Sequence, residues 1–221
     1  SVQGALEDAI FKFSGERAAA FSAGRTDAGV HATAMPAHFD LERPRPPGVV
    51  RDALNFHLKP EPVAVLEAEE AAGDFHARFS ATARRYRYRI VNRRAPLTLD
   101  AGRAWRLAPP IDAEAMHAAA QVLVGRHDFT TFRASTCQAD TPVKTLSSIA
   151  VERRGDDVFI ETSARSFLHH QVRSMAGSLA EVGMGRWSAA DFEAAFRAAD
   201  RSACAQVAPP EGLYFIGADY N

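Results

Sequence analysis

In the stretch ATARRYRYRIV, residues 81 to 91, arginines alternate with aromatic or aliphatic residues from Arg85 onward. Side chains of a β-strand alternate between two faces, so this spacing predicts a strand with one cationic face and one aromatic or aliphatic face. The first face carries Arg85, Arg87 and Arg89, and the second carries Tyr86, Tyr88 and Ile90. The ordinary place for such tyrosines is the core, and we expect Tyr88 there.

Further strands and helices are predicted on both sides of this stretch. Residues 146–164 indicate two strands joined by a tight turn, and residues 212–220 have the apolar density of a buried strand. A short alternation at 63–65 is typical of another strand. Helical spacing of apolar residues predicts helices over 2–13 and 167–182.

The length of 221 residues suffices for one large domain or two small ones. Helices and strands are mixed in a similar way in both halves, which predicts two α+β subdomains that meet at a cleft. We expect an N-terminal subdomain over residues 1–107 and a C-terminal subdomain over residues 108–221, with a hinge near residues 107–110.

Composition favours an ordinary globular protein, since 47% of the residues are hydrophobic and 24% are charged. No apolar run approaches the length needed to cross a bilayer, and no signal-peptide pattern is found. The two cysteines, Cys137 and Cys204, fit neither a disulfide framework nor a metal knuckle. We therefore expect a reducing, cytoplasmic setting and no membrane partner.

The formal net charge of −1 is unevenly distributed. Residues 78–106 hold nine arginines and a single acid, Asp100, so this segment carries +8 and the rest of the chain carries −9. A chain polarised in this way can present a positive surface to an anionic polymer such as a nucleic acid. The alternative is an arginine-rich strand that is merely solvated, and charge alone leaves both open.

The segment GRTDAGVHA, residues 24–32, places Asp27 in a short polar loop between two glycines. The glycines allow a tight turn and a close approach of a ligand, while Arg25 favours an ionised carboxylate or binds a phosphate. An aspartate in such a loop commonly does no more than cap its own backbone. The residue pattern leaves a catalytic and a turn-forming Asp27 open.

The sequence motifs of several kinds of functional site are absent. His169 and His170 are adjacent, and neighbouring residues of a helix point about 100° apart, so we expect no metal site at these histidines or at His31. The metal patterns HExxH and CxxC are absent, as are the glycine-rich loops of nucleotide-binding proteins and the GxSxG elbow of serine hydrolases. We therefore expect neither a metal nor a cofactor.

Five blocks, in this order, resemble the bacterial TruA family of tRNA pseudouridine synthases. The resemblance extends from Val2 to Tyr220, effectively the whole chain, and five ordered blocks are more specific than any one of them. The blocks are GRTDAGVHA (24–32), DFHARFSATARRYRYRI (74–90), DFTTFRAS (128–135), SFLHHQVRSMAGSLAEVGMG (166–185) and EGLYFIGADY (211–220).

The resemblance implies roles for five residues. Asp27 matches the catalytic nucleophile of the family, and Arg173 matches the basic partner of that acid. Tyr86 matches the aromatic residue that lies against the target uracil, and Leu213 is implied as an apolar wall opposite it. Arg25 is implied to contact the substrate backbone and to help splay the target nucleotide.

The resemblance also implies a fold and an activity. The expected fold is the pseudouridine synthase fold, an α+β fold with largely antiparallel sheets around a central active-site cleft. The expected activity is isomerisation of uridine to pseudouridine at positions 38, 39 and 40 in the anticodon stem-loop of tRNA, carried out by a homodimer without metal or cofactor. Family members place a strand of the type YxGxxFxGWQ before the first helix, and this sequence lacks it, either because the segment was lost or because the sequence is trimmed before Ser1. Its absence leaves open a sheet edge and some RNA contacts near the active site, but not the block that contains Asp27.

Two other functions remain open at this stage. A non-catalytic RNA-binding protein would keep the basic strand but tolerate substitution of Asp27. An aspartate-dependent enzyme acting on a small anionic substrate would not need most of the positive charge in residues 78–106. Of the three, only a pseudouridine synthase converts uridine in tRNA without a change of mass.

Overall fold

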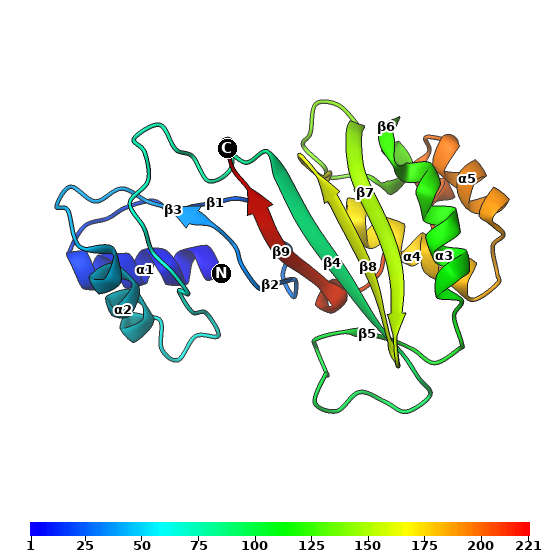
Figure 1. Ribbon diagram of the computed structural model, residues 1–221, viewed down its shortest axis with the longest axis horizontal. Coiled ribbons are helices and arrows are strands. Elements are labelled where there is room, and N and C mark those ends of the chain that lie inside the picture. Colours follow the sequence, from blue (N-terminus) through cyan, green and yellow to red (C-terminus); the bar gives the residue numbers. More distant parts are fainter. The chain divides into compact units, whose positions relative to one another are not determined.

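The computed structural model describes residues 1–221, which form two compact units. Unit 1 comprises Ser1–Arg25 and Met35–Ala81 with Asn221, and unit 2 comprises Thr26–Ala34 and Thr82–Tyr220. Figure 1 shows the elements of each unit with the labels used below. Every helix is too short or too polar to cross a membrane.

Unit 1 is built on two helices and a short two-stranded sheet. Helix α1 (Val2–Ser14) ends where Gly15 adopts a φ of 76°, a left-handed conformation that favours glycine. Helix α2 (Pro47–His57) packs against α1, and strand β1 (Phe21–Ser22) pairs antiparallel with β3 (Ala37–His38). The core of the unit consists of Ala9, Ile10, Ala20, Val50, Leu54 and Leu58.

Unit 2 contains a seven-stranded mixed sheet in the order β2, β9, β4, β8, β7, β6, with β5 paired to β4. Strands β2 and β9 are parallel, as are β4 and β5, while the other pairs are antiparallel. The strands are β2 (His31–Ala32), β4 (Ala83–Asn92), β5 (Trp105–Leu107), β6 (Gly125–Asp128), β7 (Val143–Arg154), β8 (Asp157–Ala164) and β9 (Leu213–Asp219).

Strand β4 confirms the alternation expected from the sequence. Its arginines Arg85, Arg87 and Arg89 retain solvent exposure, while Tyr88 and Ile90 are fully buried. The strand lies inside the sheet because β8 pairs with one edge and β9 with the other, as Figure 1 shows. The mixed α+β architecture with mostly antiparallel strands agrees with the expected fold class.

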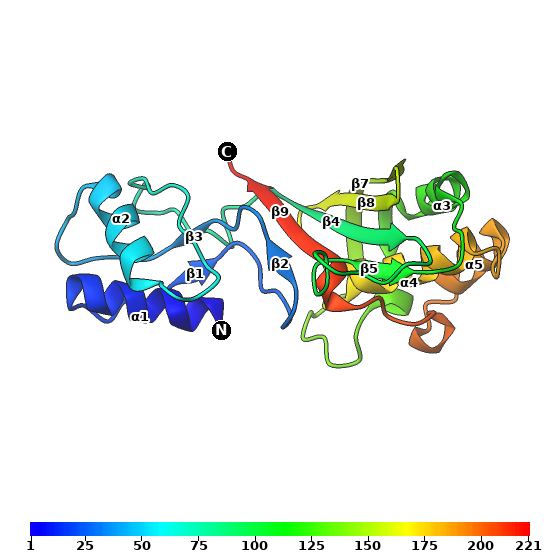
Figure 2. The same ribbon diagram turned by 90° about the horizontal axis from the view of Figure 1, so that it is seen from below.

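Three helices of unit 2 pack with this sheet. Helix α3 (Ala113–Ala120) contacts β7, and α4 (Gln171–Gly183) contacts β4 and α3. Figure 2 shows α4 along one face of the sheet, with α5 (Ala189–Arg197) beside it. Short 3₁₀ turns cover Gln121–Leu123, Thr130–Phe132, Arg201–Ala203 and Pro210–Gly212.

The two compact units differ from the subdomains expected at residues 1–107 and 108–221. Strand β4 comes before that boundary, but its partners β8 and β9 come after it, so the hydrogen bonds of one sheet join both sides of the boundary. The units instead change at residues 25/26, 34/35 and 81/82, where the chain passes from unit 1 to unit 2 and back.

Candidate active site

Asp27 lies in the loop that leads into β2. The backbone turns here because Gly29 adopts a φ of 84° and the Val30 N–H donates a 3.1 Å hydrogen bond to the Asp27 carbonyl. Strand β2 then joins the sheet by parallel pairing with β9. The loop thus fixes Asp27 beside the sheet of unit 2, with 28% of its side chain exposed.

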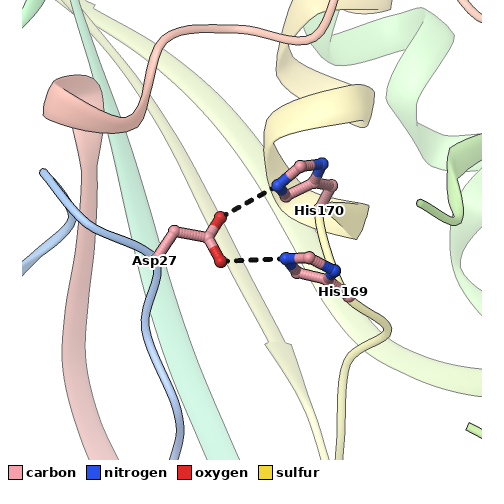
Figure 3. A group of neighbouring side chains, drawn as sticks. All are labelled: Asp27, His169 and His170. Carbon is pink, nitrogen blue, oxygen red and sulfur yellow. Dashed lines mark hydrogen bonds and ion pairs between the residues drawn. The ribbon is translucent and has the colours of Figure 1, made fainter. Parts of the chain in front are cut away.

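Three basic side chains surround the Asp27 carboxylate. Arg173 Nη1 donates a 2.7 Å hydrogen bond to Oδ2, and His170 Nε2 lies 3.2 Å from the same oxygen. His169 Nε2 lies 3.0 Å from Oδ1. Figure 3 shows both imidazoles pointing at the carboxylate from the segment that precedes α4. Both oxygens of Asp27 are therefore occupied by groups of one short segment, residues 169–173.

The start of α4 explains how two adjacent histidines reach one carboxylate. We expected a helix from residue 167, on which His169 and His170 would diverge, but α4 begins at Gln171. The two histidines precede the helix, and His170 adopts a φ of 63°. Their rings lie 4.0 Å apart between centroids, so the expected divergence is wrong. These two contacts were missed, although both histidines stand in the block that contains Arg173.

Arg173 is held at this position by a backbone segment that follows α5. Its Nε donates a 2.8 Å hydrogen bond to the Ala208 carbonyl, and the Ala208 N–H donates a 3.1 Å bond to the Arg173 carbonyl. Only 13% of the Arg173 side chain is exposed. The guanidinium therefore meets Asp27 in a fixed orientation, and the structure brings together the acid and the base that the sequence suggested as partners.

Opposing effects set the protonation of Asp27. Burial on its own raises the pKa of this carboxyl, but the hydrogen bond from Arg173 and the interactions with His170 and His169 together lower it by more. The pKa of Asp27 therefore lies below its ordinary value of 3.8, and the group is ionised at neutral pH. Because an ionised carboxylate only accepts hydrogen bonds, His169 Nε2 carries the proton in the bond to Oδ1.

The same surroundings favour the neutral form of His170, whereas they favour the charged form of Asp27. Burial lowers the pKa of this imidazole, Asp27 acts against that effect, and His169, Arg173 and Arg201 add to the lowering. The pKa of His170 lies below its ordinary value of 6.5, so the ring is neutral at neutral pH. Arg173 therefore supplies a fixed positive charge beside Asp27, while His170 supplies none.

The cluster of Asp27, His169 and His170 also has the donor types of a metal site. One carboxylate oxygen and two imidazole nitrogens lie within 4.8 Å of one another, and such a set suits zinc and related metals. However, Arg173 donates to the same carboxylate and places a fixed positive charge beside any cation bound there. The arrangement suits a carboxylate held as an anion better than a metal ligand set.

Tyr86 belongs to the same region of unit 2. Its ring makes edge contacts with Phe167 and Phe215, with centroids 5.1 and 5.3 Å away. Burial raises the pKa of Tyr86 to about 12, with Arg84 opposing the rise and Asp27 adding to it. The phenol is therefore neutral, its ring orientation is fixed by two aromatic neighbours, and it lies within electrostatic reach of Asp27.

The two remaining predicted residues are placed differently. Leu213 is buried at the start of β9, but it pairs in register with Tyr88, whereas Tyr86 pairs with Phe215. Its role as a wall opposite Tyr86 stays a prediction. Arg25 is exposed and is the last residue of the first segment of unit 1, so its role also stays a prediction.

Comparisons with known proteins assign the chain to a family. A family model described as tRNA pseudouridine synthase matches residues 119–221, which include all of α4 with Arg173. This match places residues 119–221 among the tRNA pseudouridine synthases, the class that the five sequence blocks resemble.

Similar proteins support the same family assignment over the whole length of the chain. The tRNA pseudouridine synthase A of Maricaulis maris (strain MCS10) is 59% identical over 220 residues, covering 100% of this chain and 88% of that protein. The proteins of the same name from Rhizorhabdus wittichii and Afipia carboxidovorans are each 60% identical, covering 100% of this chain and 87% and 90% of their own lengths. The chain belongs to the tRNA pseudouridine synthase A family.

Proposed function

We propose that this chain isomerises uridine to pseudouridine at positions 38, 39 and 40 in the anticodon stem-loop of tRNA, with Asp27 as the catalytic carboxylate. Membership of the family supports the isomerase activity on tRNA. The observation that carries the assignment to Asp27 is its half-buried, ionised carboxylate, paired with Arg173 at 2.7 Å. The positions within tRNA and the homodimer follow from the family resemblance.

The reaction needs an anionic group that stays in contact with a detached base. The N-glycosidic bond of uridine breaks, the uracil turns, and a carbon–carbon bond forms from C1′ of the ribose to C5 of the base. The C5 proton leaves and N1 takes up a proton, so the product is an isomer of uridine, with no net oxidation and no hydrolysis. Attack by a carboxylate at C1′, attack at C6, and proton removal at C2′ each require Asp27 in its ionised form.

Arg173 has two functions in this proposal. It keeps Asp27 deprotonated despite burial, and its hydrogen bonds to Asp27 and Ala208 orient the carboxylate. Preorganised charge of this kind costs no reorganisation at the moment of reaction. His169, which is more exposed than Arg173, holds Oδ1 in the free protein and is the group that an entering nucleotide displaces more easily.

Tyr86 supplies the surface for the target base. A uridine inside a stem-loop must leave its stack before Asp27 can reach it, which costs a few kcal/mol. Stacking on an aromatic ring returns about 1–3 kcal/mol per base. Because Phe167 and Phe215 fix the ring, Tyr86 does not have to be ordered when the base arrives. Arg25, which is exposed, is suited to binding a phosphate of the splayed nucleotide.

The test is tritium release from tRNA labelled at C5 of uridine. We expect Asp27→Asn to reduce release by at least about 10³-fold, since it removes the reacting charge while keeping the shape. Binding of tRNA is expected to persist, and Asp8→Asn, which changes an exposed acid on α1, is expected to behave as wild type. Near-normal release by Asp27→Asn contradicts the assignment, and a wild-type protein that binds tRNA without release is an RNA-binding protein only.

A further inference from the structure

The arginines of β4 are already paired with acids. The sequence left open whether they hold RNA phosphates, and in the structure each one on the cationic face has a carboxylate at hydrogen-bond distance. The pairs are Arg85–Asp219 at 2.6 Å, Arg87–Glu161 at 2.7 Å, and Arg89 with Asp157 at 2.7 Å and Asp100 at 2.8 Å. An RNA phosphate would have to compete with a carboxylate at each of these arginines.

A hollow of about 310 Å³ beside β6 and β7, in contrast, is lined by cationic residues that are not paired with acids. The residues that line it are Arg126, Lys144 and Arg165, which are cationic, Thr141, Thr145 and Ser166, which carry hydroxyls, and Val143. No aspartate or glutamate contributes to the lining, and none of the three cations forms an ion pair. Their charges are therefore available to an anion from outside the chain.

The sheet places two of these side chains together, while Lys144, the neighbour of Thr145 on β7, starts from the opposite face of the strand. Arg126 of β6 lies directly opposite Thr145 of β7 in the antiparallel register, so both point to the same face. Ala164 at the end of β8 pairs with Leu146 of β7, and Arg165 continues from that strand. The hollow is thus bordered by the ends of three hydrogen-bonded strands, which fix the spacing of its donors before a ligand binds.

The donor set matches a phosphate group. Guanidinium and ammonium groups make short, charge-assisted hydrogen bonds to phosphate oxygens, and serine and threonine hydroxyls commonly add further ones in nucleic-acid complexes. A carboxylate ligand would satisfy fewer donors, because it offers two oxygens to three cations and three hydroxyls.

The hollow is also close to the active site along the chain. Arg165 precedes His169 by four residues, and four residues span at most roughly 14 Å when fully extended. His169 contacts the Asp27 carboxylate. A phosphate bound at Arg165 would therefore lie near the segment that contacts Asp27.

We propose that this hollow binds a backbone phosphate of the tRNA substrate, near the nucleotide that Asp27 modifies; the proposal rests on the proposed function. It assigns Arg126, Lys144 and Arg165 to substrate binding and leaves the paired arginines of β4 to the stability of the sheet. Since phosphates carry no sequence information, the contact positions the strand without selecting a base.

The experiment compares two triple variants that change the net charge equally. Arg126→Gln/Lys144→Gln/Arg165→Gln empties the hollow of charge, and Arg87→Gln/Arg154→Gln/Arg197→Gln removes three arginines that are paired with Glu161, Glu152 and Glu193. The dissociation constant for tRNA is measured over a range of salt concentrations. For the first variant we expect binding to weaken by roughly 10-fold and the slope of log K against log salt to fall by about 0.7–0.9 for each phosphate lost.

The control variant is expected to keep the wild-type slope. Equal slopes for wild type and the first variant overturn the proposal, and so does an equal loss in both variants, which would indicate net charge alone. The single change Arg126→Gln, at an exposed site, repeats the test with little risk to folding. Tritium release by the wild type is measured separately, so failure of the hollow and failure of the proposed function remain distinguishable.

Discussion

At the scale of single residues, the state of Asp27 depends on Arg173. Burial disfavours the charged carboxylate, and the guanidinium at 2.7 Å supplies the largest effect that opposes burial. Because the folded-state pKa of Asp27 is lowered, its contribution to stability is present above its ordinary pKa of 3.8 and is lost as pH falls through the lower folded value. Protonation of Asp27 thus does not limit activity at mildly acidic pH.

Replacing Arg173 is expected to change the pH profile. In Arg173→Gln, burial acts on Asp27 with less opposition, so the pKa of Asp27 rises and the acid limb of kcat/KM moves to higher pH. Turnover at neutral pH is expected to fall by at least about 10-fold while tRNA affinity changes little. Single-turnover rates and filter binding across pH measure both. A change confined to the dissociation constant would contradict the role given to the ion pair.

The sequence predicts part of this site and misses part of it. The pairing of Asp27 with Arg173 follows from the family blocks, because each residue belongs to its own recognisable block. The contacts of His169 and His170 depend on where α4 begins. That start is set by the left-handed backbone of His170, and apolar spacing over 167–182 carries no information about it.

At the scale of elements, α4 depends on a close approach between backbones. An ideal Cβ on Gly177 would lie 1.9 Å from the carbonyl oxygen of Gln206, which is backbone and cannot rotate away. The glycine in the middle of this helix is therefore required by packing, although glycine weakens a helix by itself. Apolar spacing predicts the helix but does not predict the segment that lies against it.

Gly177→Ala is accordingly expected to destabilise the protein by about 1–3 kcal/mol or more, as overpacking of a filled core does. The matched control is Gly48→Ala in α2, where a Cβ meets nothing within 4 Å and alanine is expected to stabilise the helix by about 0.5–1 kcal/mol. Urea unfolding monitored by circular dichroism measures both. Equal midpoints for Gly177→Ala and wild type would show that residues 204–209 move aside.

Other elements show why local pattern has limits. The strand expected at 81–91 is observed as Ala83–Asn92, because alternation and length both support it. The strand expected at 63–65 does not form, since the Asn55 side chain bonds both the N–H and the C=O of Val65, each at 2.8 Å. A side chain has taken the place of a neighbouring strand there, and alternation does not reveal which partner a segment finds.

At the scale of the whole molecule, the composition of the sequence does not predict the division into two units. Residues 26–34 leave unit 1 to pair with β9, and residues from 82 onward build the sheet with strands far along the chain. Such pairings are decided by tertiary contacts. The charge of the positive segment 78–106 is likewise only partly offset, from +8 to +5, when β8 and β9 bring Asp157, Glu161 and Asp219 to it.

Because unit 1 has a core of its own, a mutation in that core is expected to destabilise unit 1 more than unit 2. Leu54 is 2% exposed in the core of unit 1, and Leu54→Ala is expected to cost about 2–5 kcal/mol there. Both tryptophans, Trp105 and Trp187, belong to unit 2. Tryptophan fluorescence is therefore expected to keep its urea midpoint while the circular dichroism transition broadens and moves lower. Equal shifts of both signals would mean that the units unfold together.

The segment after α5, residues 206–209, is expected to respond differently to substitutions and to insertions or deletions. The Ala208 carbonyl holds Arg173, the Pro209 carbonyl accepts a 2.7 Å bond from Tyr88, and the Gln206 carbonyl lies over Gly177. All three contacts use main-chain oxygens, which every amino acid possesses. Substitutions at Gln206 and Pro209 would thus leave these carbonyl contacts in place, whereas a one-residue insertion or deletion would shift all three oxygens at once and release Arg173.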